Sequence, residues 1–187
     1  GAHVGKSAFF IRLASCKVGC PWCDTKESWL EDLHPKESIQ QLAQKVANAK
    51  KQGASFVVLT GGEPLHHNLD PLCDAIRRIT TLQTNKQMPI HLETSGVNQL
   101  SGFHNWITLS PKRHAPPVLS VLAMCHELKV IIHEQSDLLF AEEMAEKAIK
   151  AKQSLKTYHN NFEKPLLFLQ PGWKNTIGEQ IAIEYVK

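Results

Sequence analysis

The sequence lacks the features of membrane, secreted and nucleic-acid-binding proteins. Its longest apolar runs, such as residues 56–59, fall far short of the roughly 20 residues that a membrane span needs. A basic start followed by an apolar stretch and a cleavage site is missing, so no signal peptide is visible. The net charge is only +3 and the charged residues are scattered, which leaves no footprint for nucleic acid.

The composition is that of an ordinary globular domain. Hydrophobic residues make up 42% and charged residues 21% of the 187 residues, a length that suits one domain. Apolar runs predict strands, and amphipathic patterns predict helices between them. The expected strands are residues 8–13, 55–60, 89–93, 105–109, 127–133 and 166–169. The expected helices are residues 37–52, 70–82, 136–152 and 175–185.

This alternation predicts an α/β fold with a parallel sheet covered by helices. About six strands and about four helices are too few for a complete eight-unit barrel, which needs ~250 residues. A partial barrel or an open doubly wound sheet therefore remains.

Polar or glycine-rich segments follow four of the expected strands, at residues 60–64, 93–96, 110–112 and 170–172. Each of them could be an ordinary turn. The carboxyl ends of parallel strands share one rim, however, and ligands bind at that rim. Together the four segments predict a ligand site beside the loop that follows the first strand.

The five cysteines are unevenly placed. Cys16, Cys20 and Cys23 crowd into eight residues, whereas Cys73 and Cys125 stand alone. An odd count with this crowding argues against disulfides and favours a metal or redox role in the cytosol. Because Cys73 lies in an amphipathic helical pattern and Cys125 precedes a strand, we expect both to be buried thiols.

The spacing Cys-x3-Cys-x2-Cys favours an iron–sulfur cluster. Three thiolates can bind three irons of one cubane, whereas ordinary [4Fe–4S] electron carriers use four cysteines. The remaining iron would stay open to another ligand. Structural zinc is the alternative, but it prefers four ligands, and the second Cys-x2-Cys pair is absent. His34 could serve as a fourth zinc ligand on sequence distance alone.

The three-cysteine motif is followed one strand later by Gly-Gly-Glu-Pro at residues 61–64, a pair of motifs that resembles the signature of the radical S-adenosylmethionine (SAM) superfamily. The finer pattern is similar to the 7-carboxy-7-deazaguanine synthase family along essentially the whole chain. The similar segments are residues 10–16, 20–26, 60–64, 93–96, 110–112, 127–129 and 169–172. The resemblance implies a radical SAM core, a partial TIM-like barrel, as a single domain over residues 1–187. Members of the family extend further at both ends, so we expect the chain to be truncated there.

The resemblance also implies a reaction. The family contracts the ring of 6-carboxy-5,6,7,8-tetrahydropterin to 7-carboxy-7-deazaguanine with loss of ammonia, in the queuosine pathway of tRNA modification. The [4Fe–4S] cluster binds SAM, and electron transfer cleaves SAM to methionine and a 5′-deoxyadenosyl radical that takes a hydrogen atom from the pterin. The family further implies Mg²⁺, a cytoplasmic homodimer, and a flavodoxin-like or ferredoxin-like electron donor, without direct contact to nucleic acid or membrane.

The resemblance assigns roles residue by residue. The [4Fe–4S] ligands are Cys16, Cys20 and Cys23, and the Mg²⁺ ligand is Thr25. The SAM-binding residues are Trp22, Cys23, Asp24, Gly62, Ser110, Pro111, Lys112, Gln170, Pro171, Gly172 and Trp173. The substrate-binding residues are Arg12 and Thr60.

Several of these residues have ordinary structural alternatives. Arg12 lies in an apolar strand, where a guanidinium is costly without a partner; a substrate carboxylate suits it, but so would an ion pair with Glu63 or Glu93. Gly62 would let the backbone approach the amine of SAM. Thr60 could instead cap a turn, and Lys112 could be a solvated loop cation. Glu63 could face SAM or simply stabilise the glycine turn.

Two other functions compete with the ring contraction. A glycyl-radical-enzyme activase shares the three-cysteine loop, but residues 23–26 (Cys-Asp-Thr-Lys) and 110–112 (Ser-Pro-Lys) argue against it. A small zinc- or iron–sulfur-binding module without catalysis is the second alternative.

Overall fold

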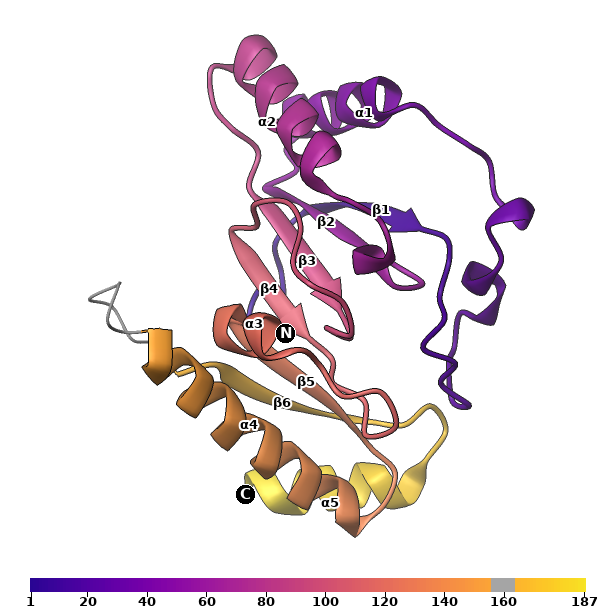
Figure 1. Ribbon diagram of the computed structural model, residues 1–187, viewed down its shortest axis with the longest axis vertical. Helices are drawn as coiled ribbons and strands as arrows, with labels where there is room; N and C mark the ends of the chain where they lie inside the picture. Colours follow the sequence, from indigo (N-terminus) through magenta and orange to yellow (C-terminus); the bar gives the residue numbers. More distant parts are fainter. Residues whose placement is uncertain (156–163) are drawn as a thin grey trace.

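The computed structural model describes residues 1–155 and 164–187 (Figure 1). Its centre is a six-stranded sheet in which every neighbouring pair is parallel and the strand order follows the chain. The strands are β1 (Ala8–Leu13), β2 (Phe56–Gly61), β3 (Ile90–Thr94), β4 (Trp106–Leu109), β5 (Glu127–Ile132) and β6 (Leu166–Pro171). An order without reversal is that of a barrel and differs from a doubly wound sheet. The sheet is therefore an unclosed partial barrel, as predicted.

Five α-helices accompany the sheet in residues 1–155 and 164–187, one more than the sequence predicts. They are α1 (Ile39–Lys51), α2 (Asp70–Thr84), α3 (Leu119–Met124), α4 (Gln135–Leu155) and α5 (Thr176–Val186). The unpredicted helix is α3, which has only six residues and is too short to show a helical repeat. Three 3₁₀ segments complete the described elements: η1 (Lys26–Trp29), η2 (Glu31–Leu33) and η3 (Pro64–His66).

The two faces of the sheet differ in polarity because side chains alternate along each strand. One face packs against the helices and carries the apolar residues, including Leu59, Ile90 and Leu92, all fully buried. The other face is concave and carries polar side chains such as Arg12 and Thr60, which are register partners on β1 and β2. The apolar face stabilises the fold. The N-terminal residues cover part of the polar face, where the Ala2 amide donates to Glu127 and the His3 ring lies against Trp106, and a cavity remains on the part nearer the carboxyl ends of the strands.

The two isolated cysteines belong to the core, as predicted. Cys73 on α2 and Cys125 at the end of α3 have no exposed surface. Burial raises the pKa of each thiol to about 11. Both therefore stay protonated at neutral pH and behave as small hydrophobic groups. Among the helices described, none is long and apolar enough to cross a membrane.

Candidate active site

A cavity of about 390 Å³ opens at the carboxyl ends of the strands, and all six strands or the segments after them contribute to it. In Figure 1 the cysteine-bearing segment after β1 lies at the edge toward which the strand arrows point. All but one of the predicted site residues line this cavity: Arg12, Cys16, Cys20, Trp22, Cys23, Asp24, Thr25, Thr60, Gly62, Ser110, Lys112, Gln170, Pro171, Gly172 and Trp173. The exception is Pro111, which is buried and lines a neighbouring cavity instead. The polar segments do converge on the cysteine loop.

Backbone hydrogen bonds fix the start of the cysteine loop against the glycine motif. The amide of Gly62 donates to the Leu13 carbonyl at 2.8 Å, and that of Glu63 donates to the Ser15 carbonyl at 2.9 Å. Ser15 itself has a φ of 83°, which is rare for a residue with a side chain. The end of β2 therefore holds the chain in the conformation that leads into Cys16.

Gly62 is required by this contact. A Cβ atom at Gly62 would lie 2.4 Å from the carbonyl oxygen of Ser15 and 2.8 Å from its carbonyl carbon. Both are backbone atoms that cannot turn away. The sequence indicates a close approach at Gly62, but the partner in the structure is the cysteine loop, and an approach to SAM remains a prediction.

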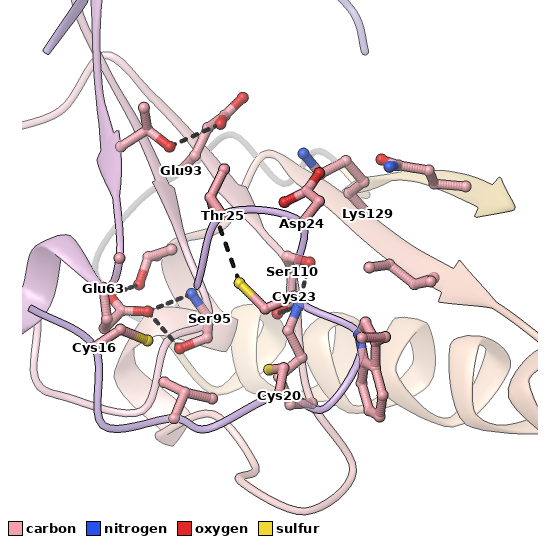
Figure 2. A pocket seen from close by; sticks show the side chains of 18 of the residues that line it. Cys16, Cys20, Cys23, Asp24, Thr25, Glu63, Glu93, Ser95, Ser110 and Lys129 are labelled. Atoms are coloured by element: carbon pink, nitrogen blue, oxygen red, sulfur yellow. Dashed lines mark hydrogen bonds between the residues drawn. The ribbon is translucent and has the colours of Figure 1, made fainter. Parts of the chain in front are cut away.

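The three clustered thiols lie around one space, with Cys20 buried and Cys16 and Cys23 half-buried (Figure 2). The Cys23 sulfur lies 3.7 Å from the Thr25 hydroxyl, and the Cys20 sulfur lies 3.8 Å from Nε2 of His114. No group of three or more His, Cys, Asp or Glu side chains in residues 1–155 and 164–187 already stands close enough to hold a metal ion. Three free thiols on one cavity wall are nevertheless the donor set that an iron–sulfur cluster takes.

The structure does not support a zinc site completed by His34. Its Nε2 atom lies 2.8 Å from the Glu27 carbonyl, and the ring lines a separate cavity between β1 and the η2 region. Structural zinc prefers four ligands. The His34 side chain is thus used elsewhere.

Lys112 is the cation whose charge acts on the Cys20 thiol. It is half-buried, and its ammonium donates to the carbonyl of Ser110 at 2.9 Å and to its hydroxyl at 2.7 Å. Burial lowers the pKa of Lys112, and the charge of Cys20 opposes that shift. Burial likewise raises the pKa of Cys20, and Lys112 opposes that rise. Lys112 is therefore part of the site's electrostatics, in contrast to a solvated loop cation.

The Arg12 guanidinium lines the cavity without a structural ion pair. Within the described part of the chain, no carboxylate lies at ion-pair distance from it. Glu93 instead accepts a hydrogen bond from the Thr60 hydroxyl at 3.0 Å. The two carboxylates that could have neutralised Arg12 thus have other partners. Arg12 is exposed, so its charge needs no partner within the protein, in contrast to the expectation from the sequence, and its binding of an anion remains a prediction.

Glu63 has a structural role. Its side chain is 1% exposed and accepts hydrogen bonds from the Leu65 amide at 3.0 Å and the Ser95 amide at 2.7 Å. The hydroxyls of Thr94 and Ser95 also donate to it. Figure 2 shows Glu63 and Ser95 joined in this way. The carboxylate ties the end of β2 to the end of β3, so it stabilises the glycine turn.

We expect Glu63→Gln to destabilise the cluster-free protein by about 1–3 kcal/mol, because an amide nitrogen would face donors and leave them unpaired in a buried place. Urea unfolding measures the change as a lower midpoint with an unchanged slope. Glu37→Gln is the control, since Glu37 pairs with Lys45 on the surface and should change stability by less than about 1 kcal/mol. Equal midpoints for the two variants would refute the structural role.

Some lining residues carry no predicted role. Lys129 lies on β5 and Glu93 is the penultimate residue of β3, and both line the cavity. The argument that singles out Arg12, a charge inside an apolar strand, applies equally to Lys129 and could have found it. His133 could not be found this way, because its place opposite Gly172 depends on how β5 and β6 pair.

Comparisons with known proteins agree on one family. The Radical SAM superfamily profile matches residues 11–101. The 7-carboxy-7-deazaguanine synthase of Prochlorococcus marinus is 57% identical over 190 residues, covering 100% of this chain and 84% of the relative. The enzyme of the same name from Synechocystis is 46% identical over 147 residues, covering 79% of this chain and 66% of the relative. The crystal structure of QueE from Escherichia coli is similar at a TM-score of 0.68 and 29% identity, covering 99% of this chain and 83% of that one.

Proposed function

The chain belongs to the 7-carboxy-7-deazaguanine synthases, which are radical SAM enzymes, and we propose on this premise that its cavity contracts the ring of 6-carboxy-5,6,7,8-tetrahydropterin with release of ammonia. The observation that carries the proposal is the convergence of three free thiols and an unpaired guanidinium on one cavity. The thiols suit a cluster, and the guanidinium suits a carboxylated substrate.

Cys16, Cys20 and Cys23 would hold the [4Fe–4S] cluster. When bound, the cluster supplies the electron that cleaves SAM and starts the radical reaction. The chain's own residues bind and orient the reactants: Lys112 and Ser110 form one polar wall, and Trp22 and Asp24 form the wall beside Cys23. The hydrogen bond that Lys112 makes to Ser110 keeps its ammonium inside the cavity, where it can face a carboxylate of SAM.

Arg12, Thr60 and Glu93 form the substrate side of the cavity. Thr60 stands beside Arg12 in the strand register, and its hydroxyl donates to Glu93. This arrangement places a cation and a carboxylate acceptor on either side of Thr60 on the concave face. A planar substrate that carries a carboxylate and ring N–H groups can bind Arg12 through its carboxylate and Glu93 through an N–H group.

We expect Arg12→Leu to lower kcat/KM for the carboxylated pterin by a factor that corresponds to a loss of roughly 2–5 kcal/mol in transition-state stabilisation, because the substrate carboxylate loses its partner. SAM binding should persist. Leucine keeps the apolar pattern of β1, so the fold should remain. The measurement is turnover at limiting substrate, with and without Mg²⁺, and the deficit should be larger without the metal. Arg77→Leu is the control, because Arg77 pairs with Asp74 on α2. Parental turnover of Arg12→Leu would remove Arg12 from the substrate site.

The proposal includes Mg²⁺ at Thr25. The Thr25 hydroxyl lines the cavity next to Cys23, and Mg²⁺ tolerates few protein ligands when substrate oxygens and water complete its shell. We expect Thr25→Ala to reduce stimulation by Mg²⁺ several-fold with iron content unchanged. Thr81→Ala on α2, whose hydroxyl bonds the Arg77 carbonyl, is the matched control. An equal Mg²⁺ response in Thr25→Ala and the parent would assign the metal elsewhere.

Three further points rest on the family resemblance: a homodimer, a flavodoxin-like or ferredoxin-like donor that reduces the cluster, and a cytoplasmic location. Anaerobic reconstitution tests the function itself. The proposal predicts iron and acid-labile sulfide in near-equal amounts, and cleavage of SAM that depends on the carboxylated pterin. Zinc in place of iron, or SAM cleavage indifferent to the pterin, would refute it.

A further inference from the structure

A tight turn between β4 and α3 connects the cysteine loop to the second half of the sheet. It spans residues 112–115, and an antiparallel bridge joins Lys112 and Ala115, with the Ala115 amide donating to the Lys112 carbonyl at 3.3 Å. Its first three side chains point to three different parts of the molecule. Lys112 bonds back to Ser110, so the direction of the turn is set at its start.

Arg113 fastens this turn to the beginning of α4. Its guanidinium donates to the Ser136 carbonyl at 3.0 Å and lies 3.5 Å from the Asp137 carboxylate. It also lies over the Phe140 ring, 4.9 Å from the centroid. The turn is therefore held on the side away from the cavity, which leaves the next residue in a defined place.

His114 is that next residue, and it contacts the cysteine loop at three points. Its Nε2 atom lies 3.1 Å from the Val18 carbonyl oxygen and 3.8 Å from the Cys20 sulfur. Its ring stands edge-on to the Trp22 indole, with centroids 5.5 Å apart and an interplanar angle of 84°. A carbonyl oxygen only accepts hydrogen bonds, so the Nε2 atom that faces it carries the proton. The same N–H also faces the sulfur, so the two acceptors share one proton.

We propose that His114 is a positioning residue that donates its Nε2–H to the Cys20 sulfur and thereby raises the reduction potential of the cluster that Cys20 would hold. The inference rests on the proposed function, because it concerns the same cluster. Hydrogen bonds to ligating sulfurs are among the protein's means of setting that potential. A donated N–H stabilises the sulfur more when an added electron has increased the negative charge on the cluster. His114 thus favours the reduced state while keeping its own proton.

The test is the midpoint potential of the reconstituted holoenzyme, followed by electron paramagnetic resonance during a redox titration. His114→Phe removes the N–H and keeps a ring against Trp22, whereas His114→Gln keeps an N–H donor. We expect His114→Phe to lower the reduced-to-oxidised ratio at a fixed potential about tenfold, which corresponds to a shift of about 59 mV toward negative values for one electron. His114→Gln should stay closer to the parent. His34→Phe is the control, since His34 contacts a backbone carbonyl and no cysteine sulfur.

Each outcome decides the inference. A parental potential in His114→Phe at full iron content would overturn it, as would loss of the cluster in both His114 variants, because the ring and not its N–H would then matter. An equal negative shift in His114→Phe and His114→Gln would also overturn it, because an N–H donor would then make no difference. A parent protein that binds no iron would instead refute the proposed function, so the two failures are distinguishable.

Discussion

Replacing Cys16, Cys20 or Cys23 by alanine should in each case abolish both cluster uptake and ring contraction. The three thiols line one cavity and make up the whole cysteine set there, so none has a substitute among the residues that the structure describes. Losing one thiolate ligand leaves an iron without its protein bond. The measurement is iron and acid-labile sulfide per chain after anaerobic reconstitution, together with product formation.

Cys73→Ala is the matched control for the three ligand variants. Cys73 lies in the core with no exposed surface, and its pKa of about 11 keeps it protonated. Its replacement removes one buried sulfur and should cost stability by about 1 kcal/mol, without affecting iron content. If all four variants lose iron alike, or if one of the clustered variants keeps it, the three-ligand arrangement is wrong.

Gly62→Val should remove the cluster along with SAM binding, and should lower the free energy of unfolding by about 3 kcal/mol. A Cβ atom would lie 2.4 Å from the Ser15 carbonyl oxygen, and Ser15 already has a φ of 83°. The cysteine loop would have to move away from β2, and Cys16 with it. A glycine needed only for SAM would instead give a variant with full iron content and weakened SAM binding.

Gly53→Ala measures what a glycine substitution costs without a clash. Gly53 follows α1 with a φ of 103°, and nothing lies within 4 Å of an added Cβ. We expect it to lose about 1 kcal/mol from backbone strain alone and to keep its iron. Urea unfolding and iron analysis separate the two variants. A Gly62→Val protein as stable and as iron-rich as Gly53→Ala would refute the steric account.

The sequence predicts the sheet well because its strands are buried and nearly continuous in hydrophobicity. The first strand has the predicted bounds, residues 8–13, and the strand at residues 90–94 is displaced by one residue. Helix α3 is missed because six residues carry too little periodicity, and its position depends on packing against α4. Local pattern thus predicts the long elements, and tertiary contacts decide the short one.

The candidate site is predictable where its residues follow strands, and less so where a partner across the sheet decides the role. The placement of Arg12 and Thr60 on the cavity agrees with the sequence. The role of Glu63 depends on Ser95, which directly follows the next strand, and the sequence leaves that role open. The contact of His114 with Cys20 joins residues 94 positions apart, and no local pattern signals it.

Mass spectrometry of the products tests the central claim most directly. The reconstituted chain is incubated anaerobically with SAM, a reductant, Mg²⁺ and 6-carboxy-5,6,7,8-tetrahydropterin. The proposed function predicts 7-carboxy-7-deazaguanine and ammonia in equal amounts, formed only when SAM and reductant are both present. Cleavage of SAM with the pterin returned unchanged, by a protein that holds iron and sulfide in near-equal amounts, would contradict it.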